Sequence, residues 1–257
     1  MPNLFVTVFA LLFGLILGSF LNVVILRDDQ RKSILTDRSR CVHCKHVLAW
    51  YDLVPVLSFI LLGARCRYCR KPISWQYPLV ECVSALLVWF AVWQGQGNWW
   101  AVGGLVVVSL ILLVLSVMDI LTMEIAVEYC ILAGVLGGIA MVSAGQITWV
   151  QSLQGAVFGG GIILLVMLLW KLIFHQDAMG VGDIWLAAAI GAVLGFPLIL
   201  PGLMAAVFIG AIAGLGLMLF KKGTVQMAIP FGPFLALGML LAFAYGPVIL
   251  QWYTLPN

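Results

Sequence analysis

Long apolar stretches recur along the chain, and short polar connections separate most of them. Each stretch reaches or approaches the roughly 20 residues that an α-helix needs to cross the hydrocarbon core of a bilayer. The pattern therefore predicts an all-α polytopic membrane protein with about eight transmembrane helices. We place them at residues 4–26, 78–94, 99–118, 125–144, 150–174, 184–200, 202–220 and 228–250. The 184–220 region has two alternative points of division, Phe196-Pro197 and Pro201-Gly202.

The composition agrees with this prediction. Hydrophobic residues make up 64% of the 257 positions and charged residues only 9%, with a mean hydropathy of +1.15. A soluble domain would be about one quarter charged, so we expect the lipid bilayer to surround most of the chain. The first apolar run, residues 4–26, is too long for a signal peptide, and no small-residue cleavage pattern follows it. We therefore interpret it as a permanent first span.

One polar segment, residues 27–71, contains ten of the thirteen Lys and Arg residues. Basic loops beside membrane spans are normally retained in the cytoplasm. We therefore predict a cytoplasmic loop and, with eight spans, two periplasmic termini. Lys171 and the pair Lys221-Lys222 then fall at the inner ends of the fifth and seventh spans. Because this topology explains the basic residues, we expect no nucleic-acid partner.

Two Cys-x-x-Cys pairs lie within this basic loop. Pairs about 20 residues apart are typical of a four-thiolate zinc site, in which each pair forms one turn of a knuckle. Four reduced, unpaired thiols are the alternative. His43 and His46 are nearby ligand types, but four cysteines already complete a tetrahedral shell, which leaves no position for a substrate. We therefore predict a structural zinc ion bound by Cys41, Cys44, Cys66 and Cys69.

The first apolar stretch has small residues at a spacing of four. Gly14, Gly18 and Asn22 lie on one face of the predicted helix, where small residues allow another helix to approach closely. A buried Asn in lipid also needs a hydrogen-bond partner. Gly155 and Gly159 repeat the spacing of four residues. We interpret these positions as helix-packing sites.

Two aspartates interrupt the apolar part of the chain. Asp119 ends the third predicted helix, and Asp183 begins the sixth, directly after Gly180 and Gly182. A carboxylate within a bilayer costs roughly 2.5–3.5 kcal/mol on insertion scales and is usually functional. The predicted topology places both aspartates near the cytoplasmic face, so we predict that they form one site.

Simpler explanations exist for each carboxylate by itself. Asp183 follows two glycines at a helix start and could serve only as a helix cap. Asp119 lies near a helix C-terminus, where the dipole opposes an anion, and no local group is expected to stabilise it. The glycines at 180 and 182 permit the close approach of another segment. Glu124 is an alternative to Asp119 for a catalytic role, as is Glu128.

Paired carboxyl groups are a known solution for peptide hydrolysis. The two groups share one proton, so that one activates a water molecule and the other donates to the carbonyl. We hypothesise that Asp183, at a positive helix end, is the ionised base and that Asp119 holds the proton. The pair titrates as a unit, so this assignment describes one microscopic state.

The segment Gly180-Val181-Gly182-Asp183 resembles the Gly-x-Gly-Asp signature of intramembrane aspartic proteases. More specifically, the chain resembles the bacterial type IV prepilin leader peptidases, which also process type II secretion pseudopilins. The resemblance extends over nearly the whole chain. Its other motifs are Gly18-Ser19-Phe20-Leu21-Asn22-Val23, Arg38-Ser39-Arg40-Cys41, both cysteine pairs, Ile73-Ser74, Tyr77-Pro78-Leu79-Val80-Glu81, Asp119 and Pro230-Phe231-Gly232-Pro233-Phe234.

This resemblance implies two activities in the bacterial inner membrane. A peptidase using Asp119 and Asp183 would remove a short basic leader peptide from prepilins or pseudopilins at the cytoplasmic face. A methyltransferase would then N-methylate the new N-terminus with S-adenosylmethionine. No fingerprint for that cofactor is visible, so the methyltransferase expectation rests on the resemblance alone. The implied parts are a first helix at 1–26, a zinc-binding loop at 27–77 and a transmembrane protease core at 78–257.

The chain departs from the family pattern at three places. Ile125-Ala126-Val127 stands where the family usually has Ile-Pro-Asp, Ala178 where it has Gly, and Trp185 where it has Lys. Because both catalytic carboxyls are kept, these changes concern substrate preference or efficiency more than the reaction type. They leave open a degenerate member that retains only part of the activity.

Two other classes of protein remain as alternatives. A cation- or proton-coupled transporter also uses membrane aspartates, but its sites usually lie near the midplane and its halves show internal repeats. A scaffold built around the zinc loop would need the cysteines and tolerate loss of either aspartate.

Overall fold

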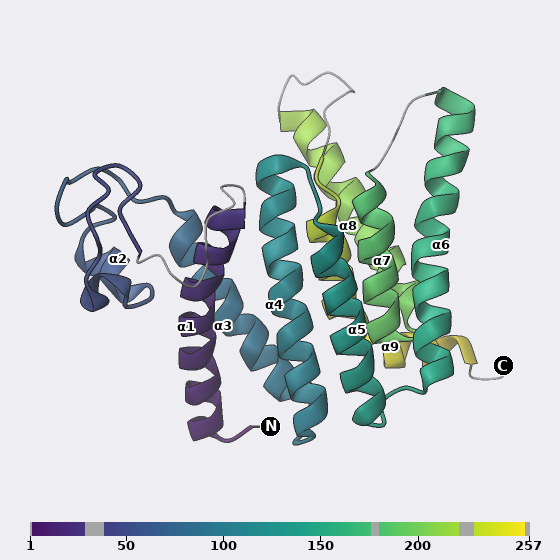
Figure 1. The fold of residues 1–257 in the computed structure, drawn as a ribbon. Helices are drawn as coiled ribbons and strands as arrows, with labels where there is room; N and C mark the ends of the chain where they lie inside the picture. The colour runs from purple at the N-terminus through teal and green to yellow at the C-terminus, as the bar shows by residue number, and fades with distance from the viewer. Residues whose placement is uncertain (1, 29–38, 176–179, 221–228, 255–257) are drawn as a thin grey trace. The chain divides into compact units, whose positions relative to one another are not determined.

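The computed structural model describes residues 2–28, 39–175, 180–220 and 229–254. In these ranges the regular structure is helical, and the only β-pairing consists of two isolated bridges, which lie in the polar loop. Figure 1 shows the helices in order along the chain. The all-α prediction is confirmed.

Within the part of the chain that the structure describes, eight helices occupy the regions predicted as spans. They are α1 (Leu4–Asp28), α3 (Gln76–Gln94), α4 (Trp99–Thr122), α5 (Val127–Ser143), α6 (Trp149–Phe174), α7 (Val181–Leu194), α8 (Ile199–Phe220) and α9 (Gly232–Thr254). Six of them are long and apolar enough to cross a membrane, whereas α5 and α7 are apolar but shorter. The polytopic fold class is confirmed, and the number of spans stays a prediction.

The helix that carries Asp183 differs from its predicted bounds. α7 begins at Val181 and ends at Leu194, because Gly195 has a φ of +73°, a conformation that glycine adopts readily. Its 14 residues extend for about 21 Å, less than the roughly 30 Å of a hydrocarbon core. The helix predicted through residue 200 therefore ends earlier, and the division from α8 falls at Phe196-Pro197, one of the two places that the sequence offered.

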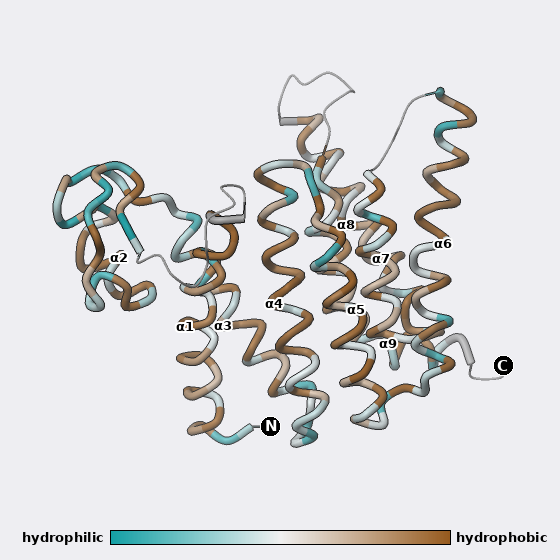
Figure 2. The backbone as a smooth tube through the Cα atoms, viewed as in Figure 1, coloured by the Kyte–Doolittle hydropathy of each residue, from teal (hydrophilic) through white to brown (hydrophobic). Residues whose placement is uncertain are grey.

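The chain divides into two compact units, residues 1–96 and 97–257. The division predicted from the sequence, with boundaries after residues 26 and 77, stays a prediction. Figure 2 shows that the helices are hydrophobic over most of their length and that hydrophilic residues concentrate in the polar loop of the first unit.

In the first unit, α1 packs along α3 through its small residues. A Cβ atom at Gly14 would lie 2.5 Å from the Cα of Ala85, and one at Gly18 would lie 2.6 Å from the Cα of Glu81. Asn22 finds its partner in the backbone carbonyl of Tyr77, to which its side-chain amide donates at 3.2 Å. The packing interpretation of this face is confirmed.

In the second unit, α4 is the central helix. Its most apolar segment is 61% buried, against 17% for the corresponding segments of α6 and α8. Large apolar side chains on α6 and α8 therefore face outward, as surfaces in contact with lipid do. Gly155 and Gly159 of α6 lie against the backbone of α7 at Gly191 and Ala187. This close contact confirms their predicted role in packing and holds α7, which carries Asp183, against α6.

Candidate active site

Asp119 lies near the C-terminal end of α4, three residues before the helix ends at Thr122. Its side chain is buried, and its Oδ2 atom accepts a hydrogen bond from the backbone N–H of Gly232 at 2.8 Å. Gly232 is the first residue of α9, where backbone N–H groups lack helical partners and the helix dipole favours an anion. Asp119 is therefore stabilised by a residue far away in the sequence and not by a local group.

Asp183 is the third residue of α7. It is also buried, and its Oδ2 atom accepts a hydrogen bond from the N–H of Gly180 at 3.2 Å. Gly180 is the N-cap residue of α7, so Asp183 is not the N-cap that one interpretation of the sequence expects, but it supports the helix start from the third helical position. The Oδ1 atom is buried and has no hydrogen-bond partner among the described residues. Because a buried carboxyl oxygen normally has a partner, capping explains only one of the two oxygens.

Gly182 allows the start of α7 to approach the segment that follows α4. A Cβ atom at this position would lie 2.6 Å from the Cβ of Ile125, in the connection between α4 and α5. The absence of a side chain at 182 therefore matters for bringing the two aspartate-bearing regions together. The prediction that this glycine permits close approach is confirmed.

The structure brings Asp119 and Asp183 into one region of the second unit. Their carboxyl groups are close enough to interact electrostatically. Both α4 and α7 pack against α5 and against α9, which connect the two aspartate-bearing helices. Figure 1 shows that α5 and α7 begin on the side of this unit where α4 ends. Two buried carboxyls that are 64 positions apart in the sequence thus lie in the same part of the unit.

The alternative acids have a different environment. Glu124 lies in the connection after α4, and Glu128 in the first turn of α5; both are exposed. Paired catalytic carboxyls depend on close approach and partial exclusion of water. Asp119 and Asp183 are buried and within electrostatic range of one another, whereas the two glutamates are exposed.

The departures from the family pattern leave this arrangement intact. α5 begins at Val127 with Ala126 at the N-cap position and no side-chain cap, so the turn after α4 forms without the Pro-Asp pair. Trp185 lies on α7, two residues after Asp183, and is 45% exposed. Ala178 lies outside the described residues, as do Lys221 and Lys222.

The four cysteines of the first unit form a compact cluster. Their sulfur atoms all lie within 4.8 Å of one another, and the Sγ atoms of Cys41 and Cys69 are 3.9 Å apart. A tetrahedral ion with Zn–S bonds of about 2.3 Å would place its sulfurs about 3.8 Å apart. No disulfide links them. The cluster therefore has the ligand set and spacing to hold a metal ion.

The two cysteine pairs have the same backbone fold. In the first knuckle the N–H of Cys41 donates to the carbonyl of His46, and in the second that of Cys66 donates to the carbonyl of Lys71. Each turn contains a residue with positive φ four positions after its first cysteine, Lys45 and Arg70. The predicted knuckle geometry is confirmed.

Local hydrogen bonds prepare one thiol for metal binding. Burial by itself would raise the pKa of the Cys41 thiol, but backbone hydrogen bonds from Cys44 and His43 outweigh this effect and lower the pKa to about 7. Since the thiolate is the form that binds zinc, Cys41 is partly in the ligand form near neutral pH.

The carboxylate of Asp52 accepts hydrogen bonds from residues near both knuckles. Asp52 accepts hydrogen bonds from the Nε atom of Arg67 at 2.8 Å, from the hydroxyl of Tyr68 at 3.2 Å and from the N–H of Ala49 at 3.3 Å. Burial would raise the pKa of Asp52, but these hydrogen bonds outweigh it and lower the pKa below its ordinary value. The carboxylate thus stays ionised and orders the segment around Cys66 and Cys69.

The fold and site define a class: a polytopic helical membrane protein with a buried aspartate pair and a four-cysteine loop. Two family models match the chain. The model described as the bacterial peptidase A24 N-terminal domain matches residues 12–95, and that of the type IV leader peptidase family matches residues 106–215.

Proteins named prepilin leader peptidase/N-methyltransferase are similar over most of the chain. The one from Aeromonas hydrophila is 33% identical, over 94% of this chain and 91% of its own length. The one from Burkholderia pseudomallei is 34% identical over 93% and 85%, and that from Myxococcus xanthus is 40% identical over 84% and 64%. No solved structure matches. The chain belongs to the type IV leader peptidase family, and the transporter alternative receives no support.

Sequence reasoning missed two neighbours of the aspartates. The motif around Gly232 was recognised in the sequence, but it did not indicate a role for this residue. A glycine followed by a proline at a helix start is a signal for a backbone N–H without a helical partner. Cys130 on α5 is buried and interacts electrostatically with Asp183. No pattern in the sequence indicated that it lies near the pair.

Proposed function

We propose that this protein is a membrane-embedded aspartic endopeptidase that removes basic leader peptides from type IV prepilins or type II secretion pseudopilins. The observation that carries the proposal is the buried pair of Asp119 and Asp183, each hydrogen-bonded to a backbone N–H at a helix start. The names of the relatives support this activity. As a multi-pass inner-membrane protein, the enzyme would meet its substrates within the bilayer.

The two carboxyl groups would act as one unit that holds a single proton. The ionised carboxylate takes a proton from a water molecule as the water oxygen attacks the peptide carbonyl carbon. The protonated carboxyl donates its proton to the carbonyl oxygen, which gives a tetrahedral intermediate. Transfer of a proton to the amide nitrogen then accompanies cleavage of the C–N bond. The unpartnered Oδ1 atom of Asp183 is suited to bind the water or the shared proton.

The structure changes the argument for assigning these roles. The hypothesis that Asp183 is the base relied on its position at a positive helix end. Asp119 also meets a helix start, that of α9, through Gly232. Helix dipoles therefore do not separate the two aspartates, and the proposal treats them as a coupled pair without a fixed base.

We further propose that the enzyme N-methylates the new N-terminus. This proposal rests on the names of the relatives, which combine both activities. S-Adenosylmethionine would supply the methyl group when bound. Among the described residues no arrangement defines a site for it.

We also propose an orientation in the membrane. The basic loop would lie in the cytoplasm and both termini in the periplasm, so the aspartate-bearing end of α4 would face the leader peptide.

The test uses the full chain in phospholipid vesicles with a prepilin-like substrate that has a basic leader followed by an apolar segment. S-Adenosylmethionine is added, and intact-mass spectrometry follows the product. We expect loss of the leader and then gain of one methyl group on the new N-terminus. Cleavage without methylation would support the peptidase alone. A folded, helical protein that leaves the substrate unchanged would instead identify a degenerate member.

We also propose that the four-cysteine cluster binds one structural zinc ion. Metal analysis of the purified protein should find about one zinc per chain. Replacing the buried ligand Cys66 with Ser should abolish binding and lower the thermal stability of the loop, because the polar loop has little apolar surface of its own to bury. Cys82→Ser is the matched control, since Cys82 is an exposed cysteine on α3 outside the cluster. Equal zinc content in both variants would contradict the assignment.

A further inference from the structure

One apolar surface of the first unit lies in the polar loop and not on a long membrane helix. It belongs to α2 (Leu57–Leu61), a helix of five residues between the two cysteine pairs. Leu57, Ile60 and Leu61 stand at positions i, i+3 and i+4, so they share one face of this helix. Their exposed fractions are 52%, 65% and 75%. Large aliphatic side chains gathered on one exposed face indicate an interaction surface.

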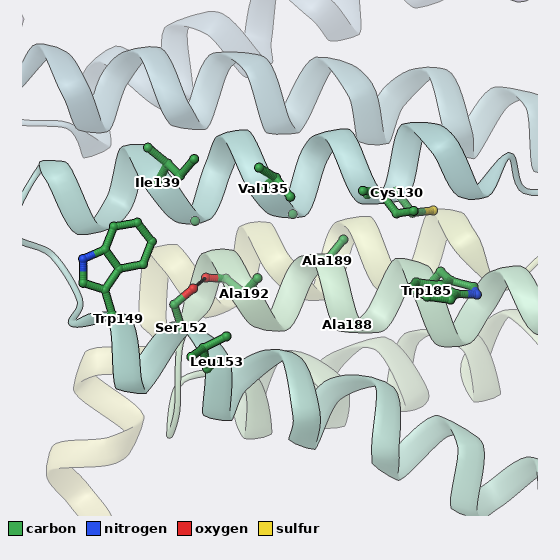
Figure 3. Close-up of a pocket in the computed structure, with 13 residues that line it drawn as sticks. Cys130, Val135, Ile139, Trp149, Ser152, Leu153, Trp185, Ala188, Ala189 and Ala192 are labelled. Carbon is green, nitrogen blue, oxygen red and sulfur yellow. Dashed lines mark hydrogen bonds between the residues drawn. The ribbon is translucent and has the colours of Figure 1, made fainter.

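Apolar surfaces on the long helices have a simpler explanation. In the second unit, a groove of about 400 Å³ between α5, α6 and α7 is lined by residues such as Val135 and Ile139, as Figure 3 shows. These three helices are apolar throughout, so lipid or a neighbouring helix is the usual surrounding of such a groove. α2 differs because five residues cannot cross a bilayer, which takes about 20. Its exposed apolar face therefore needs a separate explanation.

Two contacts hold α2 beside the start of α3. The backbone N–H of Val56, the residue before α2, donates a hydrogen bond to the Oε2 atom of Glu81 on α3 at 2.7 Å. Phe59, on the other side of α2 from the exposed residues, is buried, and its ring centroid is 5.0 Å from that of Trp75, directly before α3. From Gln76 to Glu81 the chain takes five helical steps, which is about 7.5 Å along the axis of α3. The start of α2 therefore lies against the second turn of α3.

The position of α2 along α3 corresponds to the depth of an interfacial helix. α3 has 19 residues and is about 29 Å long, so it needs its whole length to cross a hydrocarbon core of roughly 30 Å. Its first turn must then lie at the membrane boundary. Helices that lie on a membrane bury their apolar face about 5–10 Å into this boundary. Figure 1 shows α2 level with the last turns of α1, and Figure 2 shows that this part of the loop is hydrophobic.

The exposed charges of the same loop are positive. Asp52 is the one acidic residue among the described loop residues 39–75, and its side chain is only 3% exposed and paired with Arg67. Trp50 and Trp75 are also exposed, and tryptophan is enriched where membranes meet water. Basic side chains near a membrane surface attract anionic lipid headgroups. The exposed basic residues in this range are Arg40, Lys45, Arg65, Arg67, Arg70 and Lys71.

We propose that α2 anchors the four-cysteine loop to the membrane surface. Leu57, Ile60 and Leu61 insert among the lipid acyl chains, and the exposed basic residues of the loop contact anionic headgroups. Lipid fits this face better than a protein partner because α2 is fixed beside α3 at the depth where lipid surrounds that helix. The anchor holds the cysteine knuckles at the membrane instead of leaving them free in the aqueous phase. This inference is independent of the proposed peptidase function.

Fluorescence quenching tests whether the face of α2 lies in lipid. A fluorescent amino acid replaces Ile60 in the full chain, which is placed in vesicles of phosphatidylethanolamine and phosphatidylglycerol. Some of the lipid is brominated on its acyl chains, and bromine quenches a fluorophore only at close contact. Val42 is the matched control position, since it is an aliphatic residue of the same loop with a similar exposure of 56%, but it lies in the first knuckle. We expect a strong loss of emission at position 60 and little loss at position 42.

Three results would contradict the anchor. Unchanged emission at position 60 in brominated vesicles would overturn it, and so would equal quenching at positions 60 and 42. A probe at position 60 that neither brominated lipid nor a water-soluble quencher reaches would show that a protein surface covers this face.

The lipid composition tests the role of the basic residues. Replacing phosphatidylglycerol with phosphatidylcholine removes the negative headgroups and should reduce the quenching at position 60. Equal quenching in both kinds of vesicle would overturn the headgroup part of the proposal.

Discussion

Replacing either Asp119 or Asp183 with Asn should abolish leader cleavage. Each substitution keeps the shape of the side chain but removes the ability to share or transfer a proton. The two carboxyls act as a unit, so loss of one removes most of the catalysis supplied by the pair, and we expect kcat to fall by roughly 10⁴-fold or more. The measurement is the rate of leader removal from a prepilin-like substrate in vesicles, followed by mass spectrometry.

The controls separate loss of chemistry from loss of fold. Glu124→Gln and Glu128→Gln each neutralise an exposed acid near the same helix ends and should retain activity. Zinc content and thermal unfolding should remain near wild type in both aspartate variants. If Asp119→Asn or Asp183→Asn still cleaved the substrate at a comparable rate, the paired-carboxylate mechanism would be wrong.

The contact between Asp119 and α9 gives the second large effect. A Cβ atom at position 232 would lie 2.8 Å from the Oδ2 atom of Asp119, so Gly232→Ala must displace either the carboxylate or the start of α9. The hydrogen bond from the Gly232 N–H would then lengthen or break. Because small misplacements of catalytic groups have large kinetic effects, we expect kcat to fall on the order of 10²-fold with little change in KM.

A glycine in open space provides the comparison for this variant. Gly161 of α6 has no neighbouring atoms within 4 Å of its ideal Cβ position, and Gly161→Ala should leave cleavage unchanged. Parallel assays of the two alanine variants distinguish a local effect on Asp119 from a general effect of adding a methyl group. A Gly232→Ala enzyme with wild-type kcat would show that the α9 contact does not position the carboxylate for catalysis.

Much of the fold followed from local properties of the sequence. A stretch of about 20 apolar residues forms a helix in lipid because no other structure pairs every backbone group within itself. The eight long helices therefore lie where the hydropathy pattern predicts them. The cysteine knuckles were equally predictable, because two residues between ligands suit one tight turn around a metal. The exception was α7, where Gly195 and Pro197 end the helix earlier than apolar composition suggests.

The residues of the candidate site could be predicted from the sequence, but the groups that surround them could not. Asp119 and Asp183 stood out because charge is costly in an apolar segment. The hydrogen bond from Gly232 to Asp119 joins residues 113 positions apart and depends on how α9 packs against α4. No local sequence pattern predicts that contact.

The sequence by itself indicated the apolar segments that form the membrane helices, the four thiols that can share a metal ion and the two carboxyls that we propose for the chemistry. Only the tertiary structure decided which helix faces meet. Membrane helices are apolar on nearly all sides, so their sequences lack the polar face that would reveal orientation in a soluble protein. For that reason the stabilisation of Asp119 by α9, the close approach of Gly182 to Ile125 and the groove between α5 and α6 became visible only when the helices were packed.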